Sequence, residues 1–72
     1  MDKVSMIGRL RRARGETQRA VALALDVTER TYVRWEVGPT LPDAVNLIKL
    51  ADHFGVEPRV LVPESATAQE GR

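Results

Sequence analysis

Cysteine is missing from this chain, and histidine occurs only once, as His53. Without cysteine there are no disulfides and no thiolate metal sites. Long apolar runs are missing as well: none approaches the roughly 18 residues of a membrane-spanning helix, and the N-terminus lacks the apolar core of a signal peptide. These absences predict a soluble, cytoplasmic protein that binds neither a metal nor a membrane.

Residues that carry catalysis are equally sparse. The carboxylates are scattered singly, no glycine-rich phosphate loop occurs, and His53 is expected at a surface or edge rather than in a reactive centre. The 72 residues suffice for one small domain and leave no room for a second domain that senses a small molecule. We therefore expect no enzyme, no cofactor and no small-molecule ligand.

The formal net charge is only +1, but the charges are unevenly distributed. Residues 1–37 carry eight Lys and Arg against five Asp and Glu, a net charge of +3. Residues 38–72 carry three against five, a net charge of −2. A basic half of this kind can face phosphate while the acidic half faces away, although accidental asymmetry on a solvated surface gives the same count.

Apolar residues recur at helical spacing and period-two alternation is missing, which predicts an all-α, compact domain of five helices. The first helix is expected over about residues 3–14, capped by Asp2 and ended by Gly15. Residues 63–72 contain no large apolar side chain, so we expect a flexible C-terminal tail after a domain that spans residues 1–62.

The second half of the domain predicts two further helices. Asp43 can cap the fourth helix and Gly55 can close it, whereas Pro58 suits the first turn of a short fifth helix that returns Leu61 to the core. In the fourth helix an apolar stripe is expected at i, i+3, i+4 and i+7 spacing, reinforced by two more apolar residues. The stripe is Ala44, Leu47, Ile48 and Ala51, with Leu50 and Phe54.

Between these elements lie two short helices joined by a tight turn. Thr17 can cap the first, which has an apolar face of Val21, Ala22 and Leu25. Thr28 can cap the second, in which Tyr32 and Trp35 point to the core and the other residues stay outside. Two short helices at a steep angle, the second with a polar outer face, are typical of a helix-turn-helix that places a recognition helix in the DNA major groove.

A set of spaced residues resembles the Cro/repressor type of helix-turn-helix domain, the family of lambdoid phage repressors and many small bacterial regulators. The resemblance covers roughly Ile7 to Val62, and its markers form an ordered set. They are Arg11, Thr17-Gln18, Val21-Ala22, Leu25, Val27-Thr28, Trp35-Glu36, Gly38, Pro42, Leu50-Ala51, Phe54-Gly55-Val56 and Leu61.

The resemblance implies roles for three polar residues. Arg11 is expected to pair with Glu36 and to tie the first helix to the end of the third, because a buried charge needs its partner. Gln18 is expected to contact a DNA phosphate and to brace the recognition helix, since the start of a helix binds phosphate well. The alternative for Gln18 is an ordinary first-turn residue.

The resemblance also implies a set of DNA-contacting residues. Arg30 and Arg34 suit guanine, and Glu29 suits a cytosine amino group unless it pairs with Arg30. Val33, expected to be exposed, either touches a thymine methyl group or is a plain surface residue. The complete candidate set is Thr17, Gln18, Arg19, Thr28, Glu29, Arg30, Val33, Arg34 and Thr40.

Four positions depart from the family pattern. Asp26 stands in the turn where the family usually has glycine, so either it adopts a positive φ or the turn is reshaped. Glu16 replaces a common apolar residue and thins the core, and Gly8 weakens the first helix by about 1 kcal/mol. Tyr32 replaces an aliphatic residue, and its hydroxyl is expected to reach the edge of the core.

These features predict a sequence-specific regulator of transcription that binds double-stranded DNA, namely a repressor that occludes an operator. Family members commonly bind as homodimers to half-sites one helical turn apart, with dimer contacts that correspond to residues 57–62. Val60 and Val62 suit such a contact or the core of a monomer. The alternative is an antitoxin or anti-repressor, a protein-interaction module on the same scaffold.

Overall fold

The computed structural model describes residues 5–37 and 40–62. This part of the chain contains four α-helices, one 3-10 helix and no strand, so the predicted all-α class is confirmed. The fifth predicted helix is the correction, because Pro58–Leu61 form only the single 3-10 turn η1. Val62 already returns to extended backbone, as expected for a residue that precedes a proline in the sequence, so the turn cannot continue as an α-helix.

Helix α1, Met6–Ala13, begins later than the sequence pattern indicated. Ser5 has extended backbone and is its N-cap: the hydroxyl accepts a hydrogen bond of 3.1 Å from the N–H of Gly8. The expected start near residue 3 is therefore wrong, and the predicted cap Asp2 lies outside the described residues. Serine is as good an N-cap as aspartate. Ser5 lies two residues before Ile7, the first buried apolar residue of α1.

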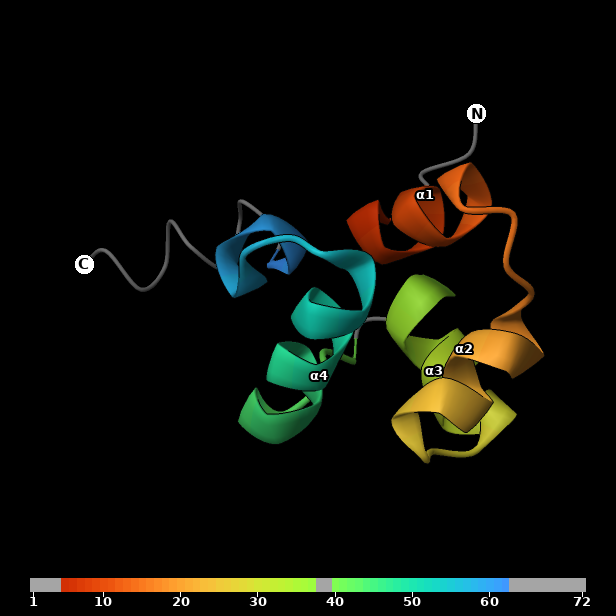
Figure 1. The fold of residues 1–72 in the computed structure, drawn as a ribbon. Coiled ribbons are helices and arrows are strands. Elements are labelled where there is room, and N and C mark those ends of the chain that lie inside the picture. The colour runs from red at the N-terminus through yellow and green to blue at the C-terminus, as the bar shows by residue number, and fades with distance from the viewer. Residues whose placement is uncertain (1–4, 38–39, 63–72) are drawn as a thin grey trace.

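Helices α2, Gln18–Leu25, and α3, Glu29–Val37, form the predicted helix-turn-helix (Figure 1). Both predicted caps are confirmed. The Thr17 hydroxyl accepts from the N–H of Ala20 at 3.0 Å, and the Thr28 hydroxyl accepts from the N–H of Thr31 at 3.1 Å. Each hydroxyl satisfies one of the N–H groups that the first turn of a helix leaves without a partner.

Three helices end with a residue in the left-handed region: Gly15 at φ 72°, Asp26 at φ 60° and Gly55 at φ 70°. In each case the following residue donates its N–H back across the last turn, as Val27 does to the carbonyl of Ala22 at 3.0 Å. Asp26 therefore adopts the positive φ that was the first of the two expected alternatives. In this helix-ending motif the residue after the left-handed one is usually apolar. Val27 and Val56 follow that rule, whereas Glu16 does not.

Helix α4, Ala44–Phe54, has the predicted cap, since the Asp43 carboxylate accepts from the N–H of Asn46 at 2.9 Å. Its predicted apolar stripe is half wrong, because Ala44 and Ile48 are exposed. The buried face is rotated toward Phe54, and its members repeat the same helical spacing with larger side chains. They are Leu50, Ala51 and Phe54, with Leu47 partly buried beside them.

The core lies where the four helices and η1 meet. Its largest fully buried side chains are Tyr32, Leu50 and Val21. The rings of Tyr32 and Trp35 lie edge to face, with centroids 6.1 Å apart. The Tyr32 hydroxyl does not reach the edge: it is buried and makes no hydrogen bond within the described residues. The other core residues are Ile7, Ala22, Leu25, Ala51, Phe54 and Leu61.

The predicted tail, residues 63–72, lies outside the described residues. Within residues 5–37 and 40–62, no helix is long and apolar enough to cross a membrane. The same residues contain no group of three or more His, Asp and Glu side chains that is placed to hold a metal ion.

Candidate nucleic-acid interface

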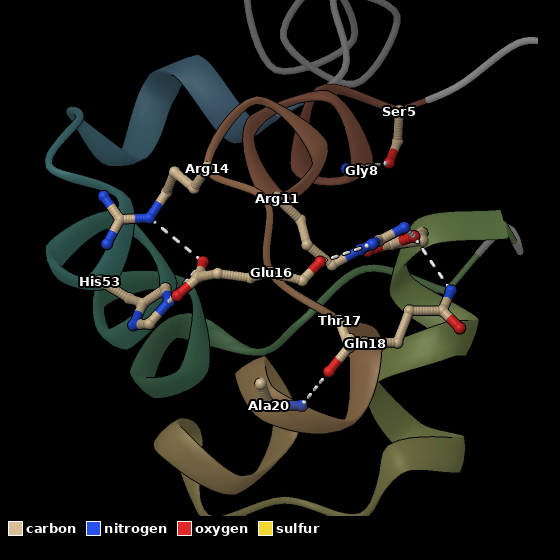
Figure 2. Close-up of polar contacts among 10 residues, drawn as sticks. Ser5, Gly8, Arg11, Arg14, Glu16, Thr17, Gln18, Ala20 and His53 are labelled. Carbon is tan, nitrogen blue, oxygen red and sulfur yellow. Dashed lines mark hydrogen bonds and ion pairs between the residues drawn. The ribbon is translucent and has the colours of Figure 1, made fainter.

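A buried ion pair fixes the inner face of α3. The Nε of Arg11 donates to Glu36 Oε2 at 2.6 Å, and its Nη2 donates to Glu36 Oε1 at 3.2 Å. The two side chains are only 13% and 6% exposed. The remaining guanidinium nitrogen, Nη1, donates to the carbonyl of Glu16 at 2.9 Å. The predicted pairing is confirmed, and it also ties α1 to the chain segment that precedes α2 (Figure 2).

The ion pair is strong enough to keep both groups charged. Burial raises the pKa of Glu36, but the hydrogen bonds, chiefly from Arg11, lower it further, so the net pKa lies below the usual carboxyl value. The bond to Glu36 raises the pKa of Arg11. Burial also raises the pKa of Tyr32, whose hydroxyl therefore stays neutral beside the pair.

Gln18 joins this network from the first turn of α2. Its Nε2 donates to Glu36 Oε1 at 3.1 Å, so one carboxylate oxygen receives both Gln18 and Arg11 (Figure 2). The bracing role implied for Gln18 is therefore visible in the geometry. One amide N–H and the amide oxygen take no part in this bond. The expected phosphate contact remains a prediction.

The hydroxyl of each capping threonine, Thr17 and Thr28, is hydrogen-bonded to the first turn of its own helix. Thr17 accepts from Ala20, whereas Thr28 accepts from the N–H of Thr31 and donates to the Thr31 hydroxyl at 2.9 Å. Both threonines are exposed, so their outer sides stay accessible. Their contact with DNA remains a prediction.

The outer face of α3 presents Glu29, Arg30 and Arg34, all exposed. Within residues 5–37 and 40–62, no hydrogen bond or ion pair holds either arginine, so both guanidinium groups are available. Val33 is half-buried rather than exposed as expected. It lies one turn before Glu36, at the border of the packed face, so only part of its side chain can reach a ligand.

The remaining two candidates lie on other elements. Arg19 is exposed in the first turn of α2, and Thr40 is exposed in the segment that leads to α4. Helix α2 packs closely against α3, and Arg19 therefore belongs to the same helix pair as the exposed arginines. For Thr40 the structure shows accessibility only.

A second polar cluster, around Glu16, was missed by sequence reasoning. His53 Nε2 lies 3.0 Å from both carboxylate oxygens of Glu16, and Arg14 Nε donates to Oε1 at 3.1 Å (Figure 2). The sequence indicated only a thinner core at Glu16 and an edge position for His53. No local pattern connects residues from the end of α1 and from α4, so only the tertiary fold brings them together.

Glu16 replaces an apolar contact with this polar one. Burial raises its pKa, but the bonds from His53 and Arg14 lower it further, so the net pKa lies below the usual value. The cluster holds α4 against the segment that immediately precedes Thr17 and Gln18. It therefore supports the position of the first turn of α2.

Together these features form a helix pair whose inner charges are paired and whose outer arginines have no partner among residues 5–37 and 40–62. Exposed arginines on one short helix, beside the start of a second helix, suit the binding of a nucleic acid, because guanidinium groups bind both phosphate and guanine. The predicted exposure holds for Arg30 and Arg34 but not for Val33, which is half-buried, and the contact of this face with DNA remains a prediction.

Comparison with known proteins is consistent with this geometry. A family model described as helix-turn-helix matches residues 7–61, which is well over half of the chain. No curated protein and no solved structure matches the chain. Because the match spans all four helices and η1, the chain belongs to the Cro/C1-type helix-turn-helix family and is a DNA-binding regulator of transcription.

Proposed function

We propose that this protein is a sequence-specific repressor that binds a double-stranded DNA operator as a homodimer and occludes it. One observation carries the proposal: α3 is fixed from inside by Arg11 and Glu36, while Arg30 and Arg34 stay exposed and unpaired among the described residues. A recognition helix needs both a defined orientation and free donors on its outer face.

In this proposal α3 lies in the major groove and reads bases. Arg30 and Arg34 donate to guanine O6 and N7, and each good bidentate contact contributes about 1–3 kcal/mol of discrimination. Glu29 accepts from a cytosine amino group, and the accessible part of Val33 contacts a thymine methyl group.

The residues around α3 then hold the DNA backbone. Gln18 can donate its second amide N–H to a phosphate while it stays bonded to Glu36, which links the phosphate position to α3. Arg19, Thr17, Thr28 and Thr40 are placed as further backbone contacts. Such contacts set orientation and raise affinity without reading sequence.

Two copies are needed because one short helix reads too few base pairs for a unique address. A homodimer on two half-sites one helical turn apart doubles the sequence that is read. Bound there, the protein blocks access to the promoter. Since the target is chromosomal or phage DNA, we place the protein in the cytoplasm.

A protein partner is the second candidate function. Leu23 and Val37 are 71% and 76% exposed on the helix pair itself, and Val60 is 41% exposed on η1. Apolar side chains beside the recognition face favour a protein contact of the kind an antitoxin makes. The two functions are compatible, because such proteins often also bind DNA.

The test is binding-site selection from random duplex DNA at near-physiological salt, followed by sequencing of the retained pool. The expected result is an inverted repeat with half-site centres about 10 base pairs apart. The double variant R30A/R34A should lose the enrichment, whereas R12A, which removes an exposed arginine from α1, should retain it. An unenriched wild-type pool would refute the operator-binding proposal and favour the protein partner.

A further inference from the structure

Three side chains hold Glu16, the residue directly before the cap and the first turn of α2. Arg11 holds its backbone: Nη1 donates to the Glu16 carbonyl at 2.9 Å, and the Glu16 N–H donates to the Arg11 carbonyl at 3.1 Å. Arg14 and His53 hold its carboxylate (Figure 2). Arginine does not lose its proton in proteins, whereas histidine changes charge near neutral pH. His53 is therefore the only one of the three whose charge can change.

The position of the imidazole ring shows where its second proton binds. His53 Nε2 lies 3.0 Å from both carboxylate oxygens of Glu16. A lone pair on Nε2 would be repelled by two anionic oxygens, so Nε2 carries a proton in the neutral ring as well, and the second proton binds Nδ1. Within residues 5–37 and 40–62, Nδ1 makes no hydrogen bond, and the side chain is 19% exposed. The ring can therefore exchange this proton with solvent.

The ring and the carboxylate are both fixed in place and ready for a stronger bond. The imidazole ring stands edge to face with buried Phe54, with centroids 5.0 Å apart. Burial raises the pKa of Glu16, but the bonds from His53 and Arg14 lower it further, so the carboxylate is ionised wherever a histidine titrates. Protonation of His53 turns a neutral N–H donor into a charged one, and charge-assisted hydrogen bonds are about twice as strong as neutral ones.

We propose that protonation of His53 strengthens DNA binding, because it tightens the contact with Glu16 and so fixes the start of α2. Glu16 precedes Thr17 and Gln18 in the chain, and Gln18 is in turn bonded to Glu36 on α3. The inference rests on the proposed function, in which this first turn contacts phosphate, and it adds the regulation of that contact by pH. His53 and Glu16 are then positioning residues, which act on DNA through α2.

The other charged groups of the region do not compete for His53. Within residues 5–37 and 40–62, no hydrogen bond or ion pair joins any of them to the ring, and their exposed charges are screened by salt. They are Lys49 and Asp52 on α4, Arg19 on α2, and Glu57 and Arg59 at η1. The proton also adds a positive charge, which DNA favours at any position on the protein. Removing the Glu16 carboxylate separates that general effect from the contact with α2.

The first experiment measures affinity for the selected DNA site at about pH 6 and about pH 8, at one ionic strength. The wild-type protein should bind about fivefold more tightly at the lower pH, which is the lower end of typical couplings between two sites. His53 is the only histidine, so His53→Gln should lose most of this ratio, and Glu16→Gln should lose it although it keeps the histidine. The control Asp52→Asn removes an exposed carboxylate next to His53 in the chain and should keep the ratio. Equal wild-type affinity at both pH values, or a wild-type ratio in either Gln variant, would overturn the inference and leave DNA binding intact.

The second experiment needs no DNA, so it separates this inference from the proposed function. The NMR signals of the His53 ring and of the Thr17 and Gln18 amides are followed between about pH 5 and about pH 8. In the wild-type protein all of them should shift with one midpoint. In Glu16→Gln, whose dispersed spectrum also shows that it folds, the two amides should no longer follow the ring. Amide signals that stay fixed while the wild-type ring titrates would refute the coupling, whether or not a selected DNA site exists.

Discussion

The substitution Glu36→Gln tests whether the buried ion pair holds the recognition helix. It preserves the size of the side chain and removes its charge, while the new amide N–H groups face the N–H groups of Arg11. Arginine cannot lose its proton to escape, so a charge that is only 13% exposed loses its counterion. Breaking one member of a buried pair costs about 3–5 kcal/mol.

That cost is a large part of the total stability. At about 0.05–0.15 kcal/mol per residue, the free energy of unfolding of a 72-residue chain is about 4–11 kcal/mol. With a urea m-value near 1 kcal/mol/M, a loss of about 3–5 kcal/mol should lower the unfolding midpoint by about 3–5 M. If the free energy of unfolding of the unsubstituted protein is near the lower value of about 4 kcal/mol, the variant is partly unfolded without denaturant.

The assay is urea denaturation followed by far-ultraviolet circular dichroism at neutral pH. Glu29→Gln makes the same chemical change at an exposed position of α3 and should alter stability by less than about 0.5 kcal/mol. The double variant Arg11→Met with Glu36→Met removes both charges and should recover much of the loss. A loss below about 1 kcal/mol for Glu36→Gln would refute the reasoning.

Four further outcomes follow from the structure. Asp26→Gly should raise stability by about 1 kcal/mol in the same urea assay, because glycine adopts φ 60° without the steric cost of a Cβ atom; unchanged stability would contradict this. Folding lowers the pKa values of Glu16 and Glu36, so the stability that these carboxylates contribute is complete above the usual pKa of 4.5 and is lost as the pH falls below it. Glu16→Gln should therefore make the free energy of unfolding depend less on pH in the acid range. An unchanged pH dependence would mean that the bonds from His53 and Arg14 to Glu16 contribute little. Arg34→Ala should reduce the base preference at one position of the selected site by about 1–3 kcal/mol. An unchanged preference would mean that Arg34 does not contact a base. Arg19→Ala should lower the affinity for all DNA sequences alike and reduce the slope of log K against log salt concentration by about 1. An unchanged slope would mean that Arg19 does not contact a phosphate.

Local chemistry explains what could be predicted from the sequence. Thr17, Thr28 and Asp43 each cap a helix whose first turn lies only three residues away, so the signal and its partner are neighbours in the chain. The left-handed conformation at Gly55 is equally local. The bond between Arg11 and Glu36 joins residues far apart in sequence, and it was predicted only through the family resemblance.

The errors arise where two local solutions compete. Helix α4 offers two apolar stripes of equal spacing, and which one is buried depends on Phe54 packing into a core that the other helices form. The missed bond between Glu16 and His53 has a different cause, since nothing near either residue in the sequence indicates the other. At the start of α1, Ser5 competed with Asp2, and both residue types are suitable caps.

The division of charges explains how so small a domain can hold a recognition helix. On α3 the carboxylate of Glu36 faces inward and is neutralised by Arg11, while Arg30 and Arg34 face outward without a described partner. The inner pair fixes the orientation of the helix before DNA arrives, so binding need not spend free energy on ordering it. If the inner pair were broken, affinity for all sequences should fall together, because every contact from α3 depends on that orientation. If only an outer arginine were lost, one base position should change and the others should keep their preference.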